Sequence, residues 1–230
     1  MLHYLQTENI NNKKSNRMKR ISFIIAAFFL LSTINAQDMK QIKLPAPNKT
    51  TGTAVMKALN DRHSERGYAA AKLLPQDLSN LLWAANGLNR PDGKRTAPSC
   101  RDFREVNVYV ITPEGAYLYD AKAHALSLLT EGDYRGAVAG GQDFVKSAPL
   151  SIVLAADLTP FGKNIDENAK LMASVDVGIV CQNINLACSG LGLATVPRAT
   201  MDKTTLKKVL KLKDTELLLM NNPVGYPKKK

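Results

Sequence analysis

Four stretches of the chain carry apolar residues at helical spacing, and they predict helices over residues 53–60, 75–86, 168–189 and 202–210. In the second stretch Leu78, Leu81 and Leu82 share one face. Pro75 stands at its first helical position and Gly87 follows its last. The third stretch is apolar nearly all round, which predicts a helix buried in the core or in a subunit interface.

Other stretches have the short apolar runs of strands. Residues 106–111 and 116–119 flank a Pro-Glu-Gly turn and predict a hairpin, on whose surface we expect Tyr117 and Tyr119. Residues 150–156 predict a buried strand and residues 216–220 a last one, while Trp83 is expected in the core. Helices and hairpin alternate without regular strand–helix–strand repetition, so the fold class expected is α+β.

The N-terminal segment has the composition of a targeting signal. Lys19 and Arg20 precede an apolar run over 21–31, and small residues follow up to Ala36. We therefore expect a signal peptide over 1–36, an extended leader over 37–52 and one domain over 53–230, with export to the periplasm or the medium. An uncleaved anchor is the alternative, and either Met1 or Met18 could be the true start.

Charge and composition narrow the function classes. The 230 residues include 31 Lys and Arg against 20 Asp and Glu, a net charge of +11, with an ordinary 45% of hydrophobic residues. No long basic run with interleaved aromatics argues for nucleic acid. The three histidines have no metal-ligand spacing, so no metal is expected, and the three cysteines are expected as buried fillers rather than disulfides.

One polar cluster stands out as candidate chemistry. Arg62 and Arg66 are four residues apart at a predicted helix end, with Ser64 between them. On one helix face, two guanidinium groups and a hydroxyl would suit a phosphate. A solvated basic surface is the equally weighted alternative. No nucleophile elbow, phosphate-binding P-loop or acid–base pair occurs, and Gly190 and Gly192 follow a helix where a dinucleotide fold needs a strand.

Five groups of residues, in order from about 55 to 227, resemble the nitroreductase family. They are Arg62-His63-Ser64-x-Arg66; Leu78-Ser79-x-Leu81-Leu82-Trp83-Ala84-Ala85-x-Gly87 with Ala97-Pro98-Ser99-Cys100; Asp176-x-Gly178-x-x-x-Gln182-Asn183-x-x-Leu186-Ala187; Gly190-Leu191-Gly192-Leu193-x-Thr195-Val196-Pro197; and Pro223-Val224-Gly225-Tyr226-Pro227. The second group favours the branch that includes azoline dehydrogenases. Helix–helix hydrogen bonding in a buried interface is the preferred role for Asp176, Gln182 and Asn183.

The resemblance implies a mostly antiparallel central sheet flanked by helices, an intertwined homodimer, and FMN bound at the dimer interface. Carried over by position, three segments would bind the cofactor. These are Arg62, His63, Ser64 and Arg66 at the phosphate and pyrimidine edge; Pro98, Ser99, Cys100 and Asp102 reaching the flavin of the other subunit; and Pro197, Arg198, Ala199 and Thr200 presenting backbone N–H groups to the flavin ring. The family often has a further Arg beyond the Gly-Tyr-Pro motif, where this sequence has Lys228–Lys230.

The implied activity is that of an FMN-dependent oxidoreductase. Electrons would pass from NAD(P)H or another donor through the flavin to nitroaromatic, quinone or similar acceptors. A flavin carries out hydride chemistry itself, so no catalytic side chain is assigned. Two alternatives are an exported FMN-binding protein without rapid turnover and a dimeric module of the same fold without flavin. The physiological donor and acceptor are not readable from the sequence.

Overall fold

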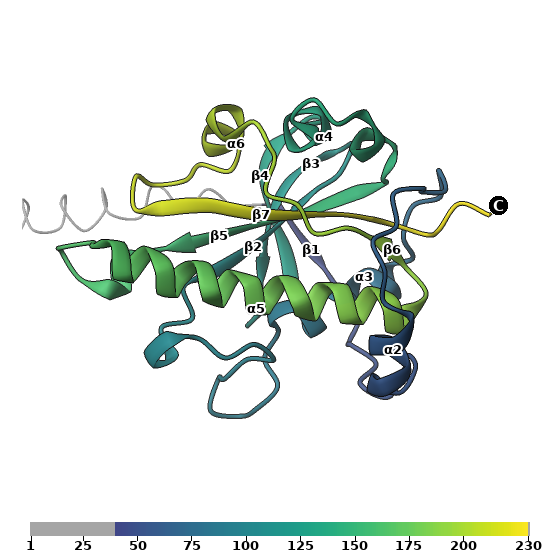
Figure 1. Ribbon diagram of the computed structural model, residues 1–230, viewed down its shortest axis with the longest axis horizontal. Coiled ribbons are helices and arrows are strands. Elements are labelled where there is room, and N and C mark those ends of the chain that lie inside the picture. Colours follow the sequence, from purple (N-terminus) through teal and green to yellow (C-terminus); the bar gives the residue numbers. More distant parts are fainter. Residues whose placement is uncertain (1–39, 230) are drawn as a thin grey trace, which may run out of the picture. The chain divides into compact units, whose positions relative to one another are not determined.

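A computed structural model describes residues 40–229 (Figure 1). The expected signal peptide, the start of the leader and Lys230 lie outside the described residues. The strands are β1 (Gln41–Lys43), β2 (Val106–Ile111), β3 (Gly115–Asp120), β4 (Ala125–Glu131), β5 (Leu150–Asp157), β6 (Ala194–Thr195) and β7 (Glu216–Gly225). The α-helices are α2 (Val55–Asp61), α3 (Pro75–Asn86), α4 (Arg135–Ala139), α5 (Glu167–Leu191) and α6 (Lys203–Val209), and short 3₁₀ turns are η1 (Cys100–Asp102), η2 (Asp143–Ser147) and η3 (Thr159–Phe161).

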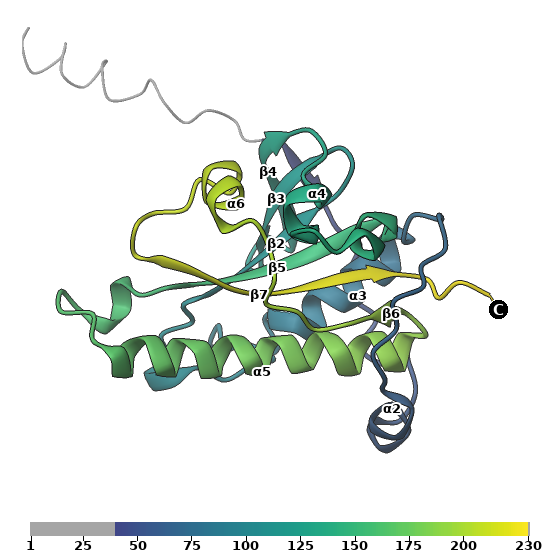
Figure 2. The same ribbon diagram turned by 45° about the horizontal axis from the view of Figure 1, so that its top comes forward.

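The strands form one sheet in the order β1-β4-β3-β2-β5-β7-β6, and every neighbouring pair is antiparallel. Helices α3 and α5 cover one face of this sheet, and α4 and α6 cover the other (Figures 1 and 2). The expected α+β class with an antiparallel sheet flanked by helices is therefore confirmed.

Strand β5 shows why the centre of the sheet is apolar on both sides. Ile152 and Leu154 pack with α3 and α5, whereas Val153 and Ala155 pack with α4 and α6. Successive side chains of a strand point to opposite faces, so a strand covered on both faces needs apolar residues at every position. The apolar run of residues 150–156, which Ser151 alone interrupts, has this cause.

Helix α3 has the bounds that the sequence predicts, and α5 extends one residue before and two residues beyond its predicted range of 168–189. Helix α3 has Pro75 at its start and ends before Gly87. In α5 the Asp166 side chain accepts a hydrogen bond from the Ala169 amide, and Gly192 closes the helix in the left-handed region, with φ 71°. By length and composition α5 could also cross a membrane, but the core helix of a soluble protein passes the same test, and α5 packs on the sheet.

The hairpin expectation is wrong in one respect, because Tyr117 and Tyr119 are buried. Strand β4, which the sequence analysis missed, pairs with β3 and makes it an interior strand. The Tyr119 hydroxyl lies 2.9 Å from His124 Nδ1, and His124 Nε2 lies 2.8 Å from the Ser79 hydroxyl on α3. These contacts place the hairpin under α3 instead of at the surface.

Strand β7 is longer than expected and runs through Pro223. Proline cannot donate to a strand ladder, which normally excludes it from an interior strand. Here Pro223 lies opposite Ser151 of β5, and its carbonyl accepts a hydrogen bond from the Thr195 hydroxyl at 2.9 Å. The extension places the last residues of β7 beside β6.

Candidate functional site

The segment after α2 is extended, not helical. Helix α2 ends at Asp61, and Arg62 has φ −57° and ψ 118°. The expectation that Arg62 and Arg66 share a helix face is therefore wrong. In an extended segment alternate side chains point to the same side, so Arg62, Ser64 and Arg66 still belong together.

The residues between those of the cluster line a cavity. His63 and Glu65 line a cavity of about 160 Å³ against the C-terminal end of α5. His63 Nδ1 lies 2.8 Å from the Asp61 carbonyl oxygen, and its Nε2 lies 3.7 Å from Glu65. The amides of Gly67 and Arg66 donate to the Glu65 carboxylate and hold its pKa below the usual range. His63 thus faces away from the three residues of the cluster.

The cluster residues have few partners of their own. Within residues 40–229, the side chains of Arg62, Ser64 and Arg66 make no hydrogen bond and no ion pair. Arg66 instead lies with its guanidinium carbon 5.9 Å from the centre of the Phe144 ring. Two guanidinium groups and one hydroxyl therefore keep donors available for an anion.

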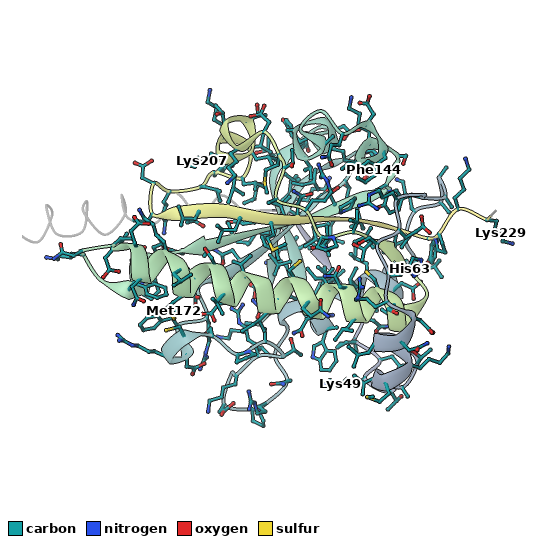
Figure 3. All side chains as sticks on the ribbon, viewed as in Figure 1. Lys49, His63, Phe144, Met172, Lys207 and Lys229 are labelled. Carbon is teal, nitrogen blue, oxygen red and sulfur yellow. The ribbon has the colours of Figure 1, made fainter. Side chains whose placement is uncertain are left out.

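Two contacts join this segment to the loop after β6. The Glu65 amide donates to the Thr195 carbonyl at 2.9 Å. The Phe144 ring contacts two guanidinium groups, those of Arg66 and Arg198, the latter 5.6 Å from the ring centre. Figure 3 shows His63, Phe144 and Lys229 at the same end of the molecule, by the C-terminal end of α5. Phe144 carries no sequence signal for this position, since only the fold brings η2 here.

The C-terminal residues run along the same segment. The Lys228 amide donates to the Gly67 carbonyl at 3.0 Å, and the Ala69 amide donates to the Tyr226 carbonyl at 2.9 Å. Tyr68 and Pro227 form an isolated bridge. The lysines that follow the Gly-Tyr-Pro motif therefore begin directly beside the arginine cluster.

The residues of the 197–200 loop have different roles, and that of Arg198 is structural. Arg198 is buried and pairs through its backbone with Asn221. Its guanidinium donates to four acceptors, which are the carbonyls of Val138 and Ala139 and the side chains of Gln142 and Asn221. Burial lowers its pKa. Arg198 thus fixes the loop, because both its amide and its guanidinium bind acceptors within the described chain.

Ala199 and Thr200 differ from Arg198, because both are exposed. Among the described residues, neither amide finds a hydrogen-bond acceptor. The Thr200 carbonyl accepts from the Asn221 side chain at 3.1 Å, which holds the peptide in place. Pro197 has no amide proton to give. Ala199 and Thr200 are therefore the backbone donors that this loop can offer.

The third predicted segment lies elsewhere in the protomer. The Cys100 amide donates to Asp176 on α5 at 2.6 Å. Asp102 forms an ion pair with Arg104 at 2.5 Å, and that hydrogen-bonded pair lowers the pKa of Asp102. Pro98 is exposed, whereas Ser99 accepts a hydrogen bond from the Arg104 amide at 2.8 Å.

One protomer does not bring the three segments together. The Pro98–Asp102 loop is fixed at Asp176, whereas α2, just before the arginine cluster, is fixed to α5 by the hydrogen bond from the Ser189 hydroxyl to the Ala58 carbonyl. These anchors are thirteen residues apart on one helix, about 20 Å at 1.5 Å per residue.

The structure confirms the role expected for one of the three polar residues of α5. Asn183 donates to the Ala85 carbonyl of α3 at 3.3 Å, which is the helix–helix bond expected. Asp176 holds a loop amide instead, so the expectation is wrong for this residue, whereas Gln182 is exposed in the protomer and its role stays a prediction. Trp83 is only half-buried and lines a cavity of about 380 Å³ between residues 48–55 and the C-terminal half of α5.

Two of the three cysteines are buried, and the side chains that could bind a metal lie apart within residues 40–229. Cys181 and Cys188 are buried as expected, Cys100 is half-buried, and all three thiols are free. Burial raises the pKa of Cys181 to about 11. Between residues 40 and 229, no three His, Cys, Asp or Glu side chains converge as a metal ion would require.

Comparisons with known proteins agree with this fold. The model of the nitroreductase family matches residues 59–226. A protein of Methanocaldococcus jannaschii named as a candidate nitroreductase is 28% identical over 201 residues, covering 84% of this chain and 95% of that protein. The crystal structure of a candidate nitroreductase from Ralstonia eutropha is 32% identical, covers 85% of this chain and 93% of that one, and has a TM-score of 0.77.

A more distant structure shows the same fold. It is an NADPH:FMN oxidoreductase from Vibrio harveyi, solved in complex with NAD⁺, which is 20% identical. The alignment covers 76% of this chain and 69% of that chain, with a TM-score of 0.58. At this identity the likeness concerns the fold alone.

Proposed function

Since the chain belongs to the nitroreductase family, we propose that this oxidoreductase uses FMN, passing electrons from NAD(P)H or another donor to nitroaromatic, quinone or similar acceptors. One observation carries the proposal. The cluster of Arg62, Ser64 and Arg66 and the amides of Ala199 and Thr200 have unused donors, and the Phe144 ring joins the two groups because it contacts both Arg66 and Arg198.

The donor set fits the parts of FMN. Two guanidinium groups and a hydroxyl match one phosphate monoester, because guanidinium forks bind phosphate oxygens through paired hydrogen bonds. Backbone amides held by neighbouring strands match the polar edge of a flavin ring, since they need no reorganisation to donate. When bound, FMN supplies the electron and hydride transfer. Arg62, Ser64 and Arg66 would bind the phosphate, and Ala199 and Thr200 would orient the ring.

The remaining predicted residues would complete the site from a second copy. The Pro98–Asp102 loop stands about 20 Å along α5 from the arginine cluster. We propose that this loop covers the flavin of the partner subunit and excludes water there. Export stays a prediction from the N-terminal segment, and so does the azoline-dehydrogenase branch.

We expect the purified protein to bind FMN in preference to FAD. The cluster offers donors for one phosphate, and the second phosphate and adenosine of FAD would find no matching site there. Titration of FMN and FAD into apo-protein, followed by quenching of flavin fluorescence, measures both affinities. Riboflavin is the matched control, because it has the same ring without the phosphate and should bind more weakly than FMN. Equal binding of FMN and riboflavin would contradict a phosphate site.

We also expect a homodimer in solution. Leu171 and Val175 lie one turn apart on α5 with 57% and 49% of their surfaces exposed, and Met56 of α2 is 73% exposed. Apolar side chains gathered on helix faces are typical of subunit interfaces. Light scattering should give twice the mass of one chain. Leu171→Lys should shift the protein toward monomer, whereas Ile42→Lys, at an exposed apolar position on β1, should not; a flavin-bound wild-type monomer would refute the dimer.

A further inference from the structure

Two buried carboxyl groups meet beneath the loop that precedes β2. Glu105 is 3% exposed and Asp176 of α5 is 5% exposed. The Asp176 carboxylate accepts the hydrogen bond from the Cys100 amide at 2.6 Å. We call Glu105 and Asp176 the acid pair. It lies outside the residues proposed to touch the cofactor.

Glu105 has no other partner for its charge. Both of its carboxyl oxygens are buried and, among the residues described, neither has a hydrogen-bond partner that meets normal geometry. Burial first, and then the neighbouring Asp176 carboxyl, raise the pKa of Glu105 to about 7. A buried carboxylate without donors is costly, so below this pH Glu105 carries a proton beside Asp176.

The loop that Asp176 holds is strained. Arg101, Asp102 and Arg104 all lie in the left-handed region, with φ of 50°, 58° and 56°. Residues with a Cβ avoid this region, and such strain persists only where surrounding contacts hold it. The contacts here are the bond from Cys100 to Asp176, the bond from the Arg104 amide to Ser99, and the Asp102–Arg104 ion pair.

We propose that the acid pair positions the Ser99–Arg104 loop, and that loss of the proton from Glu105 releases it. With Glu105 ionised, two carboxylates would face each other out of water. To relieve this repulsion, the Asp176 side chain would move away from the Cys100 amide that it binds. This inference rests on the proposed function in one respect, which is that the loop covers the partner's flavin. The expected consequence is weaker cofactor retention as the pH rises past neutral.

Other charged groups around the acid pair influence the pKa of Glu105. Arg95 lies near Glu105 and lowers its pKa, against the larger effect of burial. The Nε of Arg95 is itself buried and without a partner in the described chain. Arg104, Tyr119 and Asp120 act on Arg95 in turn. A hydrogen bond to the backbone of Glu105 also lowers this pKa, and Arg95 has the smaller effect of the two.

The sign of the pH effect follows from where the proton is bound. Glu105 keeps its proton to about pH 7 in the closed loop, against an ordinary value of 4.5. The proton on Glu105 therefore stabilises the closed loop most below pH 4.5, and this stabilisation is lost as the pH rises through about 7. For one proton linked in this way, opening should increase about tenfold between pH 6 and pH 8.

Hydrogen exchange of the full-length protein without added flavin tests directly whether the Ser99–Arg104 loop opens as the pH rises. Exchange of the peptide that holds residues 99–104, corrected for intrinsic rates, should show opening about tenfold more frequent at pH 8 than at pH 6. Glu105→Gln, which keeps the shape of the protonated acid, should remove this dependence. Glu131→Gln is the matched control, because Glu131 is exposed on β4 and should leave the dependence unchanged.

A second variant keeps the test decisive if Glu105→Gln folds poorly. Asp176→Asn retains an oxygen for the Cys100 amide but removes the neighbouring charge, so the pH dependence should shrink while the loop stays protected at pH 6. Equal protection at both pH values in the wild type would overturn the proposal. So would a pH dependence that both variants retain. FMN titration at the same two pH values separates the hypotheses, since a pH-gated loop in a protein that binds no FMN refutes only the proposed function.

Discussion

Replacing Arg62 with alanine is expected to weaken FMN binding about ten- to a hundredfold, because a charge-assisted hydrogen bond to phosphate contributes about 1.5–3 kcal/mol. Arg62 is half-buried and follows directly on α2, and its side chain makes no hydrogen bond within the described part of the chain. Its loss therefore removes a phosphate donor without breaking a structural contact. Fluorescence titration of wild type and variant measures the change.

The lysines beyond the Gly-Tyr-Pro motif provide the comparison. Lys228 starts beside Gly67, so its charge lies near the cluster, and Lys230 lies outside the described residues. An exposed lysine is a solvated point charge, and Lys228→Ala or Lys230→Ala should each cost under about 1 kcal/mol. Lys207→Ala, on the distant α6, should change nothing (Figure 3). Losses as large as that of Arg62→Ala would mean that a terminal lysine replaces the family's further arginine.

Arg198→Ala is expected to lower the free energy of unfolding by about 3 kcal/mol. Arg198 is 7% exposed, and its guanidinium satisfies two carbonyls and two side chains. Truncation leaves these buried acceptors without a donor, which costs about 1–3 kcal/mol for each group that water does not reach. The variant should also lose order in the 197–200 loop. Urea denaturation gives the change in unfolding free energy.

Arg90→Ala is the matched control for this stability effect. Arg90 is exposed in the polar loop after α3 and contacts only neighbours in sequence. Its removal should change stability by less than about 0.5 kcal/mol. An Arg198→Ala variant of normal stability but poor FMN affinity would show that the guanidinium contacts the ligand and not the loop.

Helix ends could be predicted because their signals are local. Pro75 and Gly87 mark ends that depend only on backbone geometry, and the predicted boundaries of α3 agree with the structure at both ends. The buried strand at 150–156 was equally clear, since both faces needed apolar residues. Such features depend on a few neighbouring residues, so one sequence suffices.

Features set by distant contacts could not be predicted. Strand β4 forms because β3 offers it an edge, and β7 continues through Pro223 because β5 and β6 pair with its last residues. The arginine cluster was placed on a helix face, although the pairing of Glu65 with Thr195 holds it extended. Asp176 was assigned to a helix contact, since nothing near it in sequence indicates the loop that it anchors.

The order in which the chain is synthesised bears on when the proposed site exists. Residues 62–67 are held by backbone hydrogen bonds to Thr195 and Lys228, more than a hundred residues later. During translation those partners emerge from the ribosome last, and pairing of such distant segments is intrinsically slow. The arginine cluster therefore has no fixed geometry on a nascent chain. A cofactor that needs it would be acquired only by the finished polypeptide, wherever that polypeptide folds.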